Sequence, residues 1–296
     1  MYVDSHVHLQ PHGEAPPMTR QRIEQYVEAA RERGVGQIAI TEHLFRFREA
    51  FDLLYGWWDA DAADPALAAA TWAYWEDHVS GSVADYARTI EACKSAGLPV
   101  LLGIEMDWIP GRADELHRFL EPYDWDVVLG SIHWIGAWGF DELRSPLVIA
   151  EWERCDTDVV FAAYAAMVRD LASARLCDVL AHPDLPKLGG HRPTSFTPLH
   201  TAIVEGAADG GCAIEINSNG YNKPVAEPYP ALGVLERARV AGLAITLASD
   251  AHRPERLGER FDDLVAWAAQ AGYQEYVSFE QRRPVAHALQ IATARS

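Results

Sequence analysis

The chain has 296 residues, 49% of them hydrophobic, so it can bury a substantial core in one large α/β domain or two smaller ones. Its 43 acidic side chains outnumber 25 Lys and Arg side chains, and the formal net charge of −18 argues against a general nucleic-acid binder, which needs a basic surface. The four cysteines form no C-x-x-C pair, no signal peptide is visible, and no apolar run approaches the ~20 residues that cross a bilayer. We therefore expect a cytoplasmic protein that binds no membrane, with its oligomeric state left open.

Short apolar runs alternate along the chain with segments of helical period. The runs lie at residues 1–3, 37–40, 100–104, 127–132, 178–181, 213–216 and 244–248. Such near-continuous apolar runs are typical of strands covered on both faces, and hence of a parallel sheet. The alternation predicts a single α/β barrel over residues 1–296, with an open doubly wound sheet as the alternative. The barrel is favoured because polar residues follow nearly every run and would line one mouth.

Helix signals separate several of these runs. Thr19 and Ser82 can each cap a helix, and Gly34 and Gly97 can end the same two helices. The side chains expected on buried helix faces are Ile23, Tyr26, Val27 and Ala30, then Tyr86, Ile90 and Cys93, and in a third helix Phe161, Tyr164, Ala165 and Val168. Residues 276–279 predict a last strand after the final helix.

Residues 45–80 interrupt the alternation. This segment is rich in Trp, Ala and Asp, and it is too long for a simple connection. We predict a helical lid or wall over the mouth of the barrel, and an insert that only packs against the domain is the alternative.

Histidines and carboxylates close most of the apolar runs. In an extended strand residues i and i+2 point to the same side, so His6 and His8 would project together. The full set is His6, His8, His12, His43, Glu105, His133, His182, Asp250 and His252. Core packing would place apolar residues at these positions, whereas the mouth of a barrel gathers them at one site. Imidazole and carboxylate donors without thiolate suit Zn²⁺, Mn²⁺ or Fe²⁺, and this many ligands predict two or three ions close together.

This series of strand ends resembles the PHP family, named for polymerase and histidinol phosphatase. The family's motifs occur in order as His6-Val7-His8, Thr41-Glu42-His43, Gly103-Ile104-Glu105, Ser131-Ile132-His133, His182-Pro183-Asp184 and Ser249-Asp250-Ala251-His252. The resemblance covers essentially the whole chain. It implies a distorted (β/α)7 TIM-like barrel with a trinuclear metal site.

The resemblance also implies which residues hold which ion. The first ion would be held by His6, His8, Glu105 and Asp250, and Glu105 would bridge to a second ion completed by His133 and His182. The third would be held by His12, His43 and His252. Many relatives have a longer spacer before the histidine that matches His12, or lack it, so occupancy of the third site stays open.

Three loops are most similar to those of the family's monofunctional bacterial histidinol-phosphate phosphatases, at residues 42–47, 131–141 and 215–230. This likeness implies hydrolysis of L-histidinol phosphate to L-histidinol and phosphate, a step of histidine biosynthesis, by direct attack of a metal-bound hydroxide. Glu105 and Asp250 would be catalytic as ligands. His252 or Asp184 could protonate the leaving alcohol, although Asp184 is better read as a partner that orients a ligand histidine.

Other side chains near the mouth could complete a substrate pocket. The candidate phosphate-binding cations are Arg46, Lys187, Arg192, Lys223 and Arg253. Asn217 could bond the phosphate or an amine, and Trp134 or Trp138 could stack on an imidazole ring. For each of these residues a surface charge or core packing is the alternative.

Three other functions compete with this prediction. The first is a PHP phosphoesterase acting on a nucleotide, a sugar phosphate or phosphotyrosine. The second is a metal amidohydrolase, whose barrel also opens with His-x-His but usually adds a carboxylated lysine at a strand end, and no strand end here presents a lysine. The third is a non-catalytic PHP module, which the complete ligand set disfavours.

Overall fold

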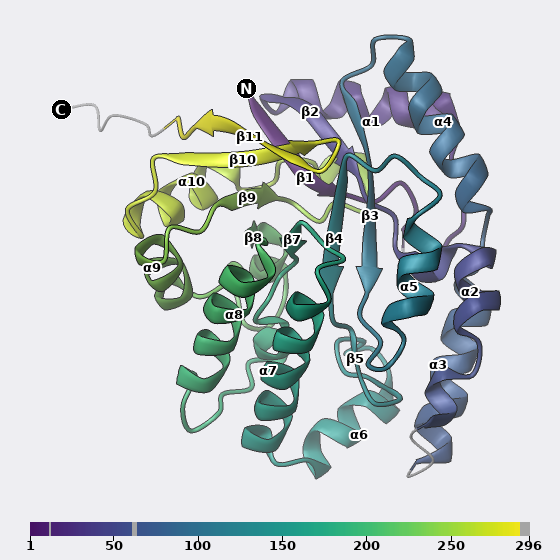
Figure 1. Cartoon of the computed structure of the whole chain (residues 1–296), viewed down its shortest axis with the longest axis vertical. Coiled ribbons are helices and arrows are strands. Elements are labelled where there is room, and N and C mark those ends of the chain that lie inside the picture. The colour runs from purple at the N-terminus through teal and green to yellow at the C-terminus, as the bar shows by residue number, and fades with distance from the viewer. Residues whose placement is uncertain (12, 61–63, 291–296) are drawn as a thin grey trace.

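The computed structural model describes residues 1–11, 13–60 and 64–290. Its centre is a seven-stranded parallel sheet in the order β1-β2-β3-β4-β7-β8-β9 (Figure 1). The strands are β1 (Tyr2–Val7), β2 (Val35–Ile40), β3 (Val100–Asp107), β4 (Val127–Ser131), β7 (Val179–Leu180), β8 (Ala213–Asn217) and β9 (Ile245–Ala248). Each matches one of the predicted apolar runs, and these strands are almost completely buried, as a parallel sheet covered on both faces requires.

The sheet curves round until its two edge strands nearly meet. Val7 at the end of β1 forms a parallel bridge with Ala251, just beyond β9. The backbone N–H of Asp250 donates to the carbonyl of His6 at 3.0 Å, and that of His8 donates to Ala251 at 2.9 Å. These bonds make a nearly closed, distorted barrel, which confirms the predicted barrel and rules out the open doubly wound sheet. They also hold residues 6 and 250 side by side at one mouth.

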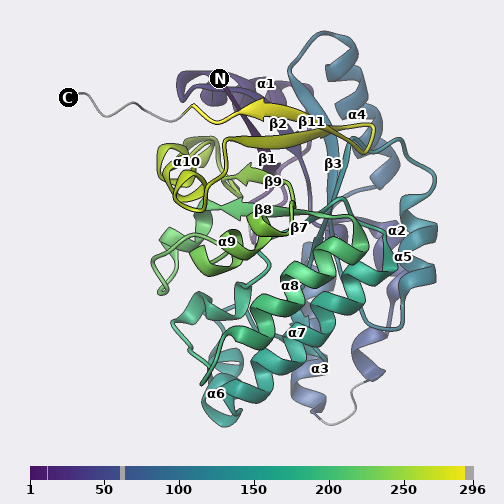
Figure 2. The same ribbon diagram turned by 60° about the vertical axis from the view of Figure 1, so that its left-hand side comes forward.

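Helices cover the outside of the barrel, as the views in Figures 1 and 2 show. They are α1 (Arg20–Glu32), α4 (Val83–Ser95), α5 (Ala113–Leu120), α6 (Pro146–Arg154), α7 (Thr157–Ala174), α8 (Thr197–Gly210), α9 (Leu232–Val240) and α10 (Phe261–Gln270). The predicted caps are confirmed, because the hydroxyls of Thr19 and Ser82 accept from the backbone N–H groups of Arg22 and Ala84. The predicted inward faces of α1, α4 and α7 are also buried. Within the described residues, no helix is both long and apolar enough to cross a membrane.

Short elements and one helix pair form the segment that interrupts the alternation. They are the 3-10 turn η1 (Leu44–Arg46), α2 (Arg48–Leu54), the 3-10 turn η2 (Trp57–Ala60) and α3 (Pro65–His78). Trp75 of α3 is fully buried and lies 5.8 to 5.9 Å, between ring centroids, from Trp57, Trp58 and Trp134. Trp134 belongs to a small hairpin, β5 (Trp134–Ile135) with β6 (Trp138–Gly139), which follows β4. The packing of these tryptophans therefore holds the insert against the β5–β6 hairpin, which follows β4 at the mouth of the barrel.

An antiparallel hairpin lies across the opposite end of the barrel (Figures 1 and 2). Its strands are β10 (Glu275–Glu280), which confirms a strand at residues 276–279, and β11 (Arg283–Ala288), which was not predicted and follows the strand expected to be the last. The turn is fixed by Asp126 and Asp178, because Gln281 N–H donates to Asp126 Oδ1 at 3.1 Å and Arg282 Nε lies 3.0 Å from Asp178 Oδ1. This hairpin covers the amino ends of the strands and leaves the carboxyl ends for the site.

Candidate metal centre

The two histidines of β1 point toward the axis of the barrel together. His6 and His8 are completely buried, and their Nε2 atoms lie 3.0 Å apart. Each Nε2 is 3.4 Å from Oε2 of Glu105, at the end of β3. Asp250 closes the group, with its Oδ1 atom 3.5 Å from His8 Nε2 and 3.9 Å from His6 Nε2. The structure thus brings together all four ligands predicted for the first ion.

Glu105 faces two groups of histidines at once. Its Oε1 atom lies 3.0 Å from His182 Nε2 and 3.4 Å from His133 Nε2, at the ends of β7 and β4. Its Oε2 atom faces His6, His8 and also His43, whose Nδ1 is 2.6 Å away. A carboxylate with one oxygen toward each group is the arrangement expected of a bridge between two ions.

Two of these candidate ligands depend on unusual backbone conformations. His182 has a φ of +27° and Asp250 a φ of +53°, in the left-handed region that non-glycine residues rarely adopt. Each residue lies two positions beyond the end of a short strand, and the turn aims its side chain into the mouth. Backbone strain of this kind costs of order 1–3 kcal/mol and collects at functional sites.

A third group of donors lies beside the first two. Nitrogens of His8, His43 and His252 lie within 4.8 Å of one another. The His8 ring stacks between the other two rings, at 4.2 Å between centroids in each case. His12, the remaining predicted ligand, lies outside the described residues, so its part in a third site stays a prediction.

Carboxylates behind the histidines fix how the rings face. Glu215 Oε2 lies 2.8 Å from His6 Nδ1, and Asp107 Oδ1 lies 2.5 Å from His133 Nδ1. A proton on Nδ1 then leaves Nε2 with its lone pair toward the centre, as ligand histidines require. Sequence reasoning assigned no role to Glu215 or Asp107. The signal was available, because Asp107 shares a strand face with Glu105 two residues earlier.

The charges in this cluster fit a divalent cation. Burial would raise the pKa of Glu105, but His43, His6 and His133 hold it well below its usual value, and His6 and His8 do the same for Asp250. Burial would lower the pKa of His6, but Glu215, Glu105 and Asp250 raise it well above its usual value. The buried Glu105 and the largely buried Asp250 therefore call for positive charge between the rings. The imidazole and oxygen donors of the cluster are those that Zn²⁺, Mn²⁺ and Fe²⁺ accept.

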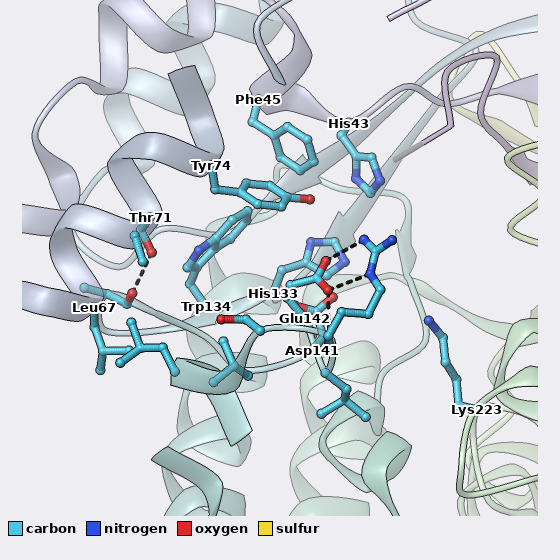
Figure 3. Close-up of a pocket in the computed structure, with 18 of the residues that line it drawn as sticks. His43, Phe45, Leu67, Thr71, Tyr74, His133, Trp134, Asp141, Glu142 and Lys223 are labelled. Atoms are coloured by element: carbon cyan, nitrogen blue, oxygen red, sulfur yellow. Dashed lines mark hydrogen bonds and ion pairs between the residues drawn. The ribbon is translucent and has the colours of Figure 1, made fainter. Parts of the chain in front are cut away.

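A cavity of about 500 Å³ opens beside this cluster (Figure 3). His43 and His133 form its inner end, and Phe45 with Leu67, Thr71 and Tyr74 of α3 forms one wall. Trp134, from the chain after β4, packs against Phe45 and Tyr74 on the same wall, at 5.8 and 5.9 Å between ring centroids. The other charged lining residues come from the chain after β6 and from the loop after β8: Asp141, Glu142, Arg144 and Lys223. The insert thus supplies part of the wall beside the cluster of candidate ligands.

Comparisons with known proteins place the chain in a family. A family model described as PHP domain matches residues 6–219. The chain belongs to the PHP family. A curated relative from Deinococcus radiodurans, named "Probable histidinol-phosphatase", is 34% identical over 284 residues, which are 95% of this chain and 97% of the relative. This match favours a PHP phosphoesterase over the metal amidohydrolase.

Solved structures of other PHP proteins share the fold. The crystal structure of histidinol phosphate phosphatase from Lactococcus lactis, complexed with zinc, L-histidinol and phosphate, has a TM-score of 0.69 at 19% identity and covers 96% of this chain and 98% of its own. A structure from Listeria monocytogenes has a TM-score of 0.67 at 20% identity, covering 88% of this chain and 99% of its own. At these identities the likeness concerns the barrel alone.

Two of the residues predicted to bind substrate in this PHP chain line the cavity. They are Lys223 and Trp134. Trp138 instead packs in the core, with its ring 4.8 Å from that of Trp152. Asn217 is fully buried, and its amide donates to Glu215 Oε1 at 2.7 Å and accepts from Asn219 N–H. Asn217 therefore positions the carboxylate that holds His6.

The other predicted cations have protein partners elsewhere. Arg46 is buried, and its guanidinium donates to the carbonyls of Gln10, Pro11 and Glu14. The exposed Arg192 pairs with Glu227, and the exposed Arg253 pairs with Glu14. Arg46 thus braces the loop after β1 rather than facing the cavity.

Asp184 and Lys187 form a buried pair away from the ligand cluster. Both are completely buried, and Lys187 Nζ lies 2.9 Å from Asp184 Oδ2. The second Asp184 contact is the backbone N–H of Ala231, which donates to Oδ2 at 2.8 Å. Of the two predicted proton donors, His252 alone lies at the cluster, with its side chain 16% exposed.

Proposed function

We propose that this PHP chain hydrolyses L-histidinol phosphate to L-histidinol and phosphate, with two or three divalent ions as cofactors. The observation that carries the proposal is the set of buried ligands around Glu105 that opens into the cavity holding Lys223. The relative that is 34% identical over nearly the full length supports this choice of substrate.

The ligand residues fall into groups that suit separate ions. We assign His6, His8, Glu105 and Asp250 to one ion, Glu105, His133 and His182 to a second, and His43 and His252 with His12 to a third. Divalent ions held by these residues would lower the pKa of water and neutralise phosphoryl oxygens, and this chemistry would allow hydroxide to attack phosphorus directly, without a phosphoenzyme.

The chain's own residues would bind and orient the substrate. Lys223 projects into the cavity and places a positive charge near the cluster, where it would pair with the phosphate (Figure 3). Phe45, Tyr74 and Trp134 supply flat apolar faces on which an imidazole ring could pack. With only the first two ions bound, His252 at the cluster would donate the proton that the leaving alcohol takes.

A panel of phosphate monoesters tests this proposal. The purified full chain should hydrolyse L-histidinol phosphate with a kcat/KM at least about 100-fold above those for p-nitrophenyl phosphate, a nucleoside monophosphate, fructose 6-phosphate and phosphotyrosine, because a shaped polar site rejects ligands that leave its groups unpaired. Similar values across the panel would leave a PHP phosphoesterase of another specificity.

A further inference from the structure

Four charged side chains, besides the histidines, line the described part of the cavity: Asp141, Glu142, Arg144 and Lys223. Two of them neutralise each other. The guanidinium of Arg144 approaches Glu142 in a two-pronged contact, with Nε 2.8 Å from Oε1 and Nη2 2.9 Å from Oε2 (Figure 3). The charges of Glu142 and Arg144 are therefore already paired with each other on the wall of the cavity.

Asp141 and Lys223 have no such partner. Neither side chain forms a hydrogen bond or salt bridge with another residue in the ranges that the structure describes, and both are half-buried. Figure 3 shows both on the wall of the same cavity. Apart from the histidines and the Glu142–Arg144 pair, the charged groups that a ligand would meet in this cavity are thus one ammonium and one carboxylate.

The surroundings of Asp141 favour a visiting cation. Burial raises the pKa of its carboxyl, and the charges of His133 and Lys223 lower the pKa without offsetting burial. A carboxylate that is partly desolvated and lacks a close counter-ion gains from a cation that brings its own hydrogen-bond donors. Asp141 is also outside each group of residues in the described chain whose donor atoms converge as metal ligands do.

We propose that Asp141 binds an ammonium group of the substrate and makes the enzyme select phosphate esters of amino alcohols. Lys223 meets the phosphate end of such a ligand and Asp141 its cationic end, so the two charges of the cavity match the two charges of the substrate. This inference rests on the proposed function, since L-histidinol phosphate carries both groups, and it assigns the specificity to one residue. Phe45, Tyr74 and Trp134 form the uncharged remainder of the wall.

Binding of the alcohol product tests the inference without requiring turnover. The metal-loaded full chain is titrated by calorimetry with L-histidinol and with 3-(imidazol-4-yl)propan-1-ol, which lacks only the amine. The wild type should prefer L-histidinol by about 10- to 100-fold, as expected for a hydrogen bond to a charged group. Asp141→Asn should reduce the preference to less than about threefold, and Asp141→Glu, which keeps the charge, should retain part of it.

Glu142→Gln is the matched control, because it removes a neighbouring negative charge that Arg144 already neutralises; it should keep most of the preference. Equal binding of the two alcohols by the wild type overturns the inference, whatever the variants do. An unchanged preference in a folded Asp141→Asn protein also overturns it.

The corresponding esters separate this inference from the proposed function. The ratio of kcat/KM for L-histidinol phosphate and for its des-amino phosphate should fall in Asp141→Asn by about 10- to 100-fold. If L-histidinol phosphate is no better a substrate than generic esters, the proposed function fails. The inference about Asp141 is then still decided by the two alcohols and by phosphoethanolamine compared with ethyl phosphate.

Discussion

Lys187 holds together two loops behind the mouth of the barrel. Its ammonium lies 2.9 Å from Asp184 Oδ2 and 3.1 Å from Glu227 Oε1, and it donates to the carbonyl of Pro228 at 2.9 Å. Lys187→Met removes all three contacts and leaves the carboxylate of Asp184 buried beside an apolar chain. Removing one partner of a buried ion pair costs about 3–5 kcal/mol. We therefore expect Lys187→Met to lower the free energy of unfolding by about that amount.

Urea unfolding followed by circular dichroism measures this loss. Thermal unfolding should show a fall of roughly 6–20 °C in Tm, taking about 2–4 °C per kcal/mol for large domains. Arg192→Met is the matched control, because Arg192 meets the same Glu227 but has a side chain 49% exposed, and such surface pairs are worth about 0–1 kcal/mol. Adding Asp184→Asn to Lys187→Met should recover part of the stability, since no uncompensated charge remains buried. An unchanged unfolding midpoint with a raised KM for phosphate esters would refute this reasoning and make Lys187 a substrate ligand.

Three further predictions concern the site and its support. Asp107→Asn should weaken metal binding by about 10- to 100-fold in a chelator competition, because it removes the charge that orients His133, whereas the exposed Asp124→Asn should not. Lys223→Met should raise KM for phosphate esters by about tenfold or more, and equal KM values would contradict its contact with phosphate. Glu49→Gln should destabilise the protein above pH 4.5 but not well below it. Burial would raise the pKa of Glu49, but hydrogen bonds from Ser82 and Val83 lower the pKa below its usual value of 4.5. The ionised carboxylate therefore stabilises the fold above the unfolded pKa, and this stabilisation is lost as pH falls through the folded pKa. Thermal unfolding between pH 3 and pH 7 checks this, and a constant difference between the two proteins would refute it.

The barrel could be predicted because each of its strands carries its own signal. Each buried parallel strand is an apolar run, and helix caps such as Thr19 and Ser82 are local patterns. The hairpins β5–β6 and β10–β11 were harder for physical reasons. The strands β5 and β6 have two residues each, which is too short for any periodicity to appear. The strand β11 is mostly exposed, so it shows no apolar pattern. The lid function of residues 45–80 stays a prediction, although α3 lines the cavity.

The convergence of the candidate metal ligands could be predicted because the fold sends the carboxyl ends of parallel strands to one mouth. The position of a Lys or Arg charge cannot be predicted in this way, because the side chain is long and tertiary contacts decide where its charged group lies. Arg46 and Lys187 each follow a candidate ligand histidine by a few residues in the sequence. In the structure, however, Arg46 donates to backbone carbonyls and Lys187 pairs with a buried carboxylate. Asp141 lies in the loop at residues 131–141 but was given no role, since its lack of a side-chain partner among the described residues is visible only in the folded cavity.

The most direct test of the account is metal removal and return with the untagged full chain. Protein dialysed against a chelator should lose hydrolysis of L-histidinol phosphate and regain it as Zn²⁺, Mn²⁺ or Fe²⁺ is added, with saturation at two or three ions per chain by elemental analysis. Glu105→Ala should bind fewer ions and regain no activity, because it removes the carboxylate that faces both histidine groups. Hydrolysis that survives chelation, or that persists in Glu105→Ala, would contradict the claim that this cluster is the catalytic centre.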